Sequence, residues 1–338
     1  MIAQAAPKKP THLTISSRIQ ERLRQGTLTQ KQVDGFQEFL KDVERKLLHH
    51  RIIRNNAYTK WFQKGTATDV ELRHFIQQFS VFSNQFLVAA LLKVINSPTL
   101  QQSRASREIL LNELGVIYRH IKQIPNPIGE IHKNKSPALL KRVTNYAHNQ
   151  PTKAGDLFTG KCLALTEEAK DKEGDPELVS TDGTVDGGIC RFQAAHFEWL
   201  LGVAQGLGLD FAEIGKRKHG RPKTLHFCDE LIHLYGSDDQ QIAQGASFAV
   251  EHWAAAGFWQ ELEDGFMRIK QMRHPHLRLA FFTWHNRVEA QHAAHTLEEL
   301  EEVYFNPNFD QAKFFEGGWQ ILEAITVFWD GLYSDLLQ

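Results

Sequence analysis

The segment Phe281-Phe-Thr-Trp-His285-Asn-Arg-Val-Glu289-Ala-Gln-His292 places two histidines and a glutamate at positions i, i+4 and i+7. At about 100° per residue, these positions share one face of an α-helix. Two imidazoles and a carboxylate are nitrogen and oxygen ligands of the kind that non-haem iron uses. A solvated polar face is the alternative, because four glutamates follow within residues 298–302. The bulky aromatic neighbours favour a buried, metal-ligating face.

Helical patterns extend outward from this segment in both directions. Apolar residues between Leu72 and Leu87 recur at the i, i+3, i+4, i+7 spacing of an amphipathic helix. Thr29-Gln-Lys-Gln32 and Thr66-Ala-Thr-Asp69 are helix start signals. No stretch shows the alternation typical of a strand, so the sequence predicts an all-α protein. The expected helices span 16–53, 66–95, 101–123, 137–148, 153–170, 192–206, 210–215, 224–235, 238–269, 276–304 and 311–335.

The predicted domain organisation follows from a change of composition in the middle of the chain. Residues 124–190 are rich in proline, glycine and aspartate, as in Ser180-Thr-Asp-Gly-Thr-Val-Asp-Gly-Gly188. We interpret them as an insertion in a helical domain that spans 66–338. Residues 1–65 are expected to form an N-terminal extension with a peripheral helix.

Composition excludes several classes of protein. The 338 residues are 42% hydrophobic and 23% charged, with a net charge of −1, which favours neither nucleic acid nor an anionic membrane as a partner. Three widely spaced cysteines form no CxxC pair, so neither a disulfide framework nor a thiolate zinc site is expected. The first residues lack the apolar core of a signal peptide, and the cytoplasm is the expected compartment.

Two further carboxylates are candidate metal ligands. Glu251 lies in Gly245-Ala-Ser-Phe-Ala-Val-Glu251, whose small residues permit close helix packing. Glu113 lies among apolar residues, and His120 would share its helix face. A buried acid is costly unless it is paired or metal-bound, although a surface position stays open for both glutamates.

The order of these motifs resembles that of the haem-oxygenase-like diiron oxidases. The resemblance rests on Glu113, His196-Phe-Glu-Trp-Leu-Leu201, the segment ending at Glu251, and His285-x3-Glu289-x2-His292, and it covers about 70–123 and 190–335. It implies a haem-oxygenase-like helical bundle, related to TenA and to the pyrroloquinoline quinone synthesis oxidase. The implied ligands of two iron ions are Glu113, His196, Glu251, His285, Glu289 and His292.

The sequence departs from the family pattern in two places. The first glutamate and the first histidine are close in sequence in the family, whereas residues 124–190 separate Glu113 from His196 here. His120 is therefore the alternative to His196, which we favour because the residues after it resemble the ligand helix of the family. Many relatives carry aspartate at the position of Glu289.

The resemblance implies a diiron oxidase or oxygenase that uses O2 on a small organic substrate such as an amine, an amino acid or a fatty acid. The expected outcome is N-oxygenation, desaturation or C–C cleavage, with an external electron donor and a homodimer as further possibilities. The alternatives are a metal-free TenA-like enzyme or cofactorless oxidase, and a helical interaction protein with a vestigial site. A basic run at 216–223 is either a solvated loop or a surface for an anionic substrate or carrier protein.

Overall fold

The chain divides into two compact units in the computed structural model. The first unit combines Met1–Glu113 with His196–Gln338, and the second is Leu114–Ala195. The structure describes residues 13–119, 181–185, 188–192 and 195–337. Within these ranges it describes the side chains except at 101, 104–105, 108–109, 112, 116–119, 181–185, 188–192, 287–292 and 295.

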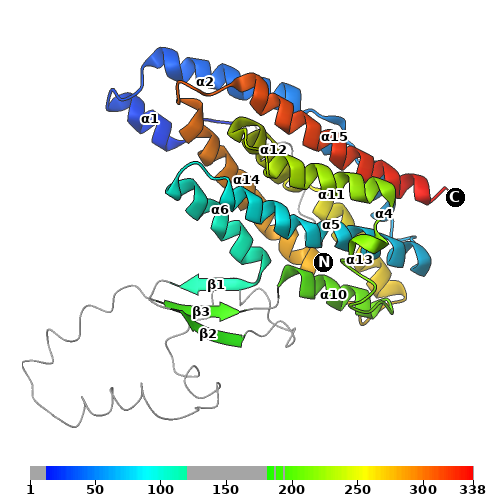
Figure 1. Cartoon of the computed structure of the whole chain (residues 1–338). Helices are drawn as coiled ribbons and strands as arrows, with labels where there is room; N and C mark the ends of the chain where they lie inside the picture. Colours follow the sequence, from blue (N-terminus) through cyan, green and yellow to red (C-terminus); the bar gives the residue numbers. More distant parts are fainter. Residues whose placement is uncertain (1–12, 120–180, 186–187, 193–194, 338) are drawn as a thin grey trace, which may run out of the picture. The chain divides into compact units, whose positions relative to one another are not determined.

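The first unit is helical throughout its described residues (Figure 1). Two short irregular turns accompany the α-helices, a π-helical turn at Glu44–Leu48 and a 3-10 turn at Arg217–His219. The α-helices are α1 (Ser17–Arg24), α2 (Gln30–Val43), α3 (Arg51–Arg54), α4 (Ala57–Phe62), α5 (Asp69–Ile95), α6 (Leu100–Glu113), α10 (His196–Gly206), α11 (Pro222–Tyr235), α12 (Gln240–Ala254), α13 (Phe258–Met272), α14 (Ala280–Tyr304) and α15 (Gln311–Asp335).

Helix α5 is a core helix of this unit. It begins in a capping box in which Thr68 and Glu71 satisfy each other's backbone N–H groups. Phe75 and Phe79 are fully buried, and their rings contact aromatic residues of α13, α14 and α15. By length and composition α5 could cross a membrane, but a core helix passes the same test. Its buried aromatic face identifies it as the latter kind.

Helices α12 and α15 approach each other closely because glycines line their contact (Figure 1). A Cβ atom at Gly245 would overlap the backbone carbonyl of Phe314, and one at Gly317 would overlap that of Ile242. The small residues before Glu251 therefore serve close helix packing, as the sequence predicts. This contact holds the helix that carries Glu251.

The N-terminal segment is an integral part of the first unit. Phe36 and Phe39 of α2 pack against Tyr304 at the end of α14. Phe62 of α4 is fully buried against Phe266 of α13. Residues 17–62 thus contribute to the aromatic core, whereas the sequence pattern predicts a peripheral extension. The prediction and the structure differ because the sequence of a short helix with one apolar face does not indicate which residues that face contacts.

Helix α6 ends earlier than its periodicity predicts. The expected helix over 101–123 stops at Glu113, because Gly115 adopts a left-handed conformation with φ of 72°. The single helix expected over 238–269 is also two helices, since Gly257 has φ of 106°. No helix forms over 210–215, where a turn leads into the 3-10 turn.

The second unit contains the strands that the sequence analysis did not predict. Strand β3 (Gly188–Phe192) pairs antiparallel with β1 (Val116–Arg119) and with β2 (Thr181–Val185), giving the order β1-β3-β2. Each strand is too short to show clear alternation, and the β1–β3 pairing is far apart in sequence. The unit begins at Leu114 and ends at Ala195, compared with the expected limits of 124 and 190. The helices expected at 137–148 and 153–170 lie outside the described residues.

Candidate metal centre

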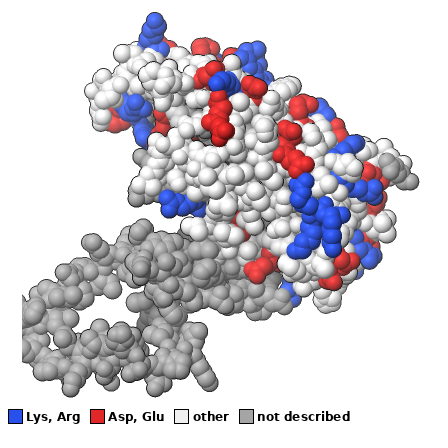
Figure 2. Space-filling model, viewed as in Figure 1, with Lys and Arg blue, Asp and Glu red and all other residues white. Residues whose placement is uncertain are grey.

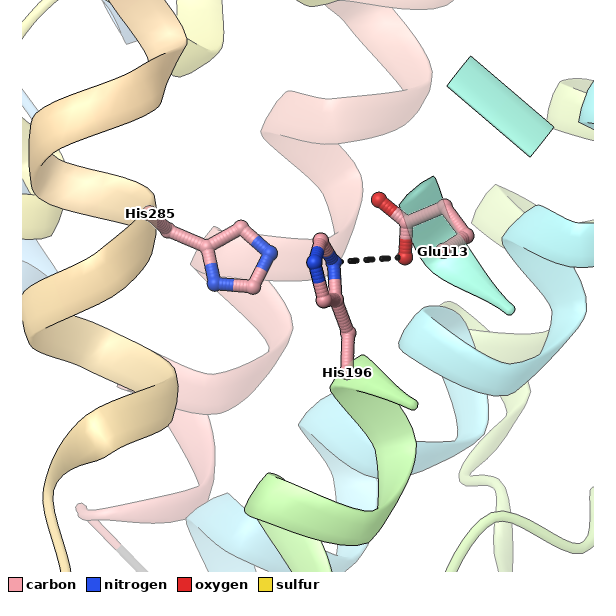
Figure 3. Close-up of side chains that lie close together, drawn as sticks. All are labelled: Glu113, His196 and His285. Atoms are coloured by element: carbon pink, nitrogen blue, oxygen red, sulfur yellow. Dashed lines mark ion pairs between the residues drawn. The ribbon is translucent and has the colours of Figure 1, made fainter. Parts of the chain in front are cut away.

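Three predicted ligands converge inside the first unit (Figure 3). Glu113 is the last residue of α6, His196 is the first residue of α10, and His285 lies in the first turns of α14. One nitrogen or oxygen atom of each lies within 4.8 Å of those of the other two. Residues that are far apart in the sequence therefore meet at one point, with His196 between the other two side chains.

The imidazole of His285 is held by its own helix and by a tryptophan. Its Nδ1 lies 2.6 Å from the backbone carbonyl oxygen of Phe281, one helical turn earlier, and donates a hydrogen bond to it. This bond places the ring proton on Nδ1 and makes Nε2 the nitrogen with an acceptor lone pair. The ring stacks on Trp259 at a centroid distance of 4.5 Å. A carbonyl partner of this kind is what orients a metal-binding histidine.

His196 is buried and faces both other members of the cluster. Its ring centroid is 4.8 Å from that of His285, and its Nδ1 is 3.1 Å from Oε2 of Glu113. That separation suits an ion pair, yet the contact lacks hydrogen-bond geometry, so Nδ1 has no hydrogen-bond partner among the described residues. A buried polar atom without a partner costs free energy, unless something else binds it.

Glu251 lies on the wall of the same site. Its side chain is buried, and it lines a cavity of about 50 Å³ together with Glu113 and His285. Helix α12, which packs closely on α15 and also contacts α14, brings it there. The structure thus places four of the predicted ligands around one small cavity or in contact with its wall.

For the remaining predicted ligands, Glu289 and His292, the structure describes the backbone alone. Glu289 and His292 belong to the backbone of α14, one and two turns after His285, but their side chains lie outside the described residues. His120, the alternative to His196, also lies outside the described residues. His196 is the histidine that the structure brings to Glu113 and His285.

The rest of the cavity wall is aromatic and was not predicted in detail. Trp253 and Trp259 both line this cavity. Periodicity on α5 showed an apolar helix face but not which part of it faces the site. The other uncharged wall residues are Phe79, Phe82, Ser83, Phe86, Val250, Ala254 and Phe281.

The chemistry of the cluster fits a transition metal such as iron. Imidazole and carboxylate together form the donor set of non-haem iron. The separations within 4.8 Å require only small side-chain movements to give bonds of about 2 Å to a shared ion. A metal would also satisfy the buried Nδ1 of His196, which no described residue does.

Comparison with known proteins identifies the fold. No family model and no curated protein sequence matches the chain. A TenA homologue from Pseudomonas syringae pv. tomato is similar in structure, with a TM-score of 0.51 and 9% identity over 88% of this chain and 93% of that chain. A domain of unknown function with a haem-oxygenase-like fold from Shewanella denitrificans gives a TM-score of 0.48 and 14% identity, with the same coverage of both chains. By its similarity to the TenA homologue, the first unit has the helical, haem-oxygenase-like fold that the resemblance predicts, whereas the second unit contains a three-stranded sheet. At this identity the similarity concerns the fold alone.

Proposed function

We propose that the helical unit binds non-haem iron, as a dinuclear centre, and uses O2 to oxidise a small organic substrate. The observation that carries the proposal is the convergence of Glu113, His196 and His285, three side chains of the two ligand types that suit iron, from three separate helices. Glu251 faces the same cavity, and Glu289 and His292 are the further ligands that the helical spacing of α14 favours. Bound iron would supply the activation of O2, which side chains alone provide poorly.

The protein itself would hold the ligands and shape the space around them. The Phe281 carbonyl and the Trp259 ring fix the orientation of His285, so that little reorganisation accompanies metal binding. Aromatic side chains make most of the cavity wall apolar, which would disfavour water beside a bound metal and limit side reactions. Ser83, Glu113, Glu251 and His285 are its polar lining residues, so a substrate would place its apolar part against the aromatic wall.

Metal analysis of the full-length protein tests this proposal. Protein loaded with iron(II) without oxygen and then desalted should retain about two irons per chain, as the six-ligand set implies. His196→Ala and His285→Ala should each lose most of the iron. His50→Ala is the matched control, because His50 is equally buried but binds Glu323 at 2.7 Å outside the cluster. Full retention of iron in both cluster variants would contradict the proposal, as would its absence from the parent protein.

A metal-free enzyme of the TenA type is the second candidate, because the fold is shared with a TenA homologue. A nucleophilic mechanism would require a thiolate near the cavity. Cys228 is buried, and burial raises the pKa of its thiol to about 12, which suppresses the thiolate at neutral pH. Cys162 and the side chain of Cys190 lie outside the described residues. Substrate turnover by protein that binds no iron would favour this candidate.

A further inference from the structure

The turn between α10 and α11 carries a concentration of positive charge. Figure 2 shows Lys and Arg side chains gathered near the start of α11. We call residues 210–223 the basic loop. All of its cationic side chains are exposed except that of Lys216, which is half-buried. They are Lys216, Arg217, Lys218, Arg221 and Lys223.

The acidic residues near the basic loop are already engaged. The Asp210 carboxylate accepts hydrogen bonds from the backbone N–H groups of Ala212 and Glu213. The Glu213 carboxylate accepts one from the N–H of Asp210. Asp229 of α11 pairs with Arg217 at 2.7 Å. Among the described residues, the side chains of Lys218 and Arg221 form no ion pair with these acids.

Helix α5 holds the basic loop in one conformation. Gly215 donates its N–H to the Ser80 hydroxyl at 2.9 Å, and its carbonyl accepts a hydrogen bond from Asn84 at 2.9 Å. Gln78 donates to the carbonyl of His219 at 2.8 Å and accepts from the N–H of Arg221 at 2.7 Å. A surface that is ordered before binding loses less conformational entropy when a partner docks.

An aromatic contact connects this loop to the residue next to His196. The Phe211 ring is 55% exposed, and Lys216 Nζ lies 3.9 Å from its centroid. On its other side Phe211 contacts the ring of Phe197 at 6.1 Å between centroids. Phe197 is the residue next to His196, and its ring packs so closely on Gly215 that a Cβ there would overlap it.

We propose that the basic loop is the docking surface for an acidic protein that donates electrons one at a time to the metal centre. The inference rests on the proposed function, because the acceptor is the iron that His196 would help to bind. Each encounter would oxidise the donor protein by one electron and reduce one iron(III) to iron(II). Positive charge steers an acidic partner to the loop, and the exposed Phe211 offers it an apolar contact.

The aromatic packing favours an electron donor over a carrier protein that delivers substrate. Phe211 contacts Phe197, which is adjacent to His196 in the chain, so the basic loop contacts the residue next to a candidate ligand. An electron can tunnel through protein over a short distance, whereas a substrate attached to a flexible arm requires an open channel. The partner is therefore defined by an acidic face with a redox group beneath it.

Binding of a plant-type [2Fe–2S] ferredoxin, as an acidic one-electron carrier, tests the docking surface. The dissociation constant should rise about tenfold or more in the variant Lys218→Glu/Arg221→Glu, and binding should weaken steeply with salt. Lys31→Glu/Lys41→Glu is the matched control, because both lysines are exposed on α2, at the other side of the unit (Figure 1). Circular dichroism verifies that both double variants are folded. Equal weakening in the two variants, no ferredoxin binding, or preferential binding of an acyl-carrier protein would overturn the inference.

Anaerobic reduction of the iron-loaded protein separates failure of this inference from failure of the proposed function. Dithionite, a small reductant that needs no docking surface, should reduce the parent protein and both double variants equally. Reduced ferredoxin should reduce the parent and the α2 variant, and the basic-loop variant at least about tenfold more slowly. If dithionite reduces no iron in any of them, the metal centre itself is wrong. If dithionite succeeds and ferredoxin reduces both variants at one rate, only the docking surface is wrong.

Discussion

Acidic side chains lie near both ends of helix α14, and their neighbours differ. Near its end, Glu301 is buried and accepts hydrogen bonds from the backbone N–H and the hydroxyl of Ser16, at 2.8 and 2.5 Å. Near its start, Glu113 and Glu251 lie around His285, and the neighbouring His196 has a buried nitrogen without a hydrogen-bond partner among the described residues. The protein thus satisfies Glu301 with its own hydrogen-bond donors, as a structural acid requires.

This difference separates a structural carboxylate from a ligand. Burying an acid costs desolvation energy, and for Glu301 two hydrogen bonds from Ser16 offset that cost. Acids gathered around imidazoles in an aromatic cavity are instead typical of a site that binds a cation. The same substitution at each site should therefore affect different properties.

Glu113→Gln should have the largest effect, and the effect should fall on metal binding. Removing a ligand should lower iron affinity by at least about 100-fold, since losing a partner of a ligand alone costs 10–100-fold. The metal-free protein should change in stability by less than about 1 kcal/mol, because the amide is nearly the same size as the carboxylate and can still contact His196. Anaerobic iron titration and urea unfolding measure the two quantities. Unchanged iron affinity in this variant would mean that Glu113 is not a metal ligand and does not differ in role from Glu301.

Glu301→Gln is the matched substitution at the structural site. It should lower the free energy of unfolding by about 1.5–3 kcal/mol, because an amide cannot accept from both Ser16 donors as well as a carboxylate does. Iron affinity should change by no more than about threefold, a small coupling for a residue outside the cluster. Urea unfolding of metal-free protein and iron titration decide this. A loss of iron as large as in Glu113→Gln would mean that the far end of α14 positions the ligands.

Glu261→Gln should give a smaller effect of opposite sign. Burial raises the pKa of Glu261, although a hydrogen bond from Thr59 at 2.5 Å opposes the shift. A folded-state pKa above the unfolded value favours folding when the acid is protonated, and this stability is lost as the pH rises through the folded pKa. At pH 7 the glutamine variant should be more stable by up to about 1 kcal/mol, because partial exposure screens the penalty.

The pH dependence of the Glu261 comparison provides its control. Below about pH 4 the parent carboxyl is protonated in both the folded and the unfolded protein, so the advantage of the variant should disappear there. Thermal unfolding at pH 7 and pH 3.5 measures the difference. A variant that is less stable than the parent at pH 7 would place Glu261 with the satisfied acids such as Glu301.

Asp69→Asn should have the smallest effect, because Asp69 is an exposed member of the same class. A hydrogen bond from His274 at 2.8 Å lowers the pKa of the Asp69 carboxyl. A lowered pKa contributes stability above the unfolded value of about 4, and this contribution is lost as the pH falls through the folded pKa. With solvent screening, the loss at pH 6 should be at most about 0.5 kcal/mol and should shrink in high salt. Urea unfolding measures this loss. A decrease of more than about 1 kcal/mol in the free energy of unfolding would show that the exposure of an acid does not determine how much it contributes to stability.

Local pattern was sufficient for the helices with strong periodicity and clear caps. The capping box before Val33 and the apolar spacing from Leu72 to Leu87 both correspond to helices, α2 and α5. It failed where a single backbone conformation decides the result, as at Gly115 and Gly257, which end or interrupt a predicted helix. A glycine in a periodic segment is compatible with both outcomes, and only the surrounding packing selects the left-handed one.

Within the candidate site, the sequence by itself determined the residue types and their spacing along each helix. His285, Glu289 and His292 share a helix face because α-helical geometry follows from local hydrogen bonding. It could not determine that Glu113 and His196, separated by the whole second unit, come together, since chain connectivity sets no distance between them.

Only the tertiary structure decided that Glu113 and His196 lie close together. It also decided which residues form the cavity wall and which partners each buried polar atom has. The close contact of α12 with α15 places Glu251, and the packing of α5 places the aromatic wall. These arrangements result from burying apolar surface over the whole unit, an energy that depends on many residues at once. Whether a buried glutamate is structural, like Glu301, or faces a metal-binding cavity, like Glu251, therefore depends on contacts that its local sequence does not contain.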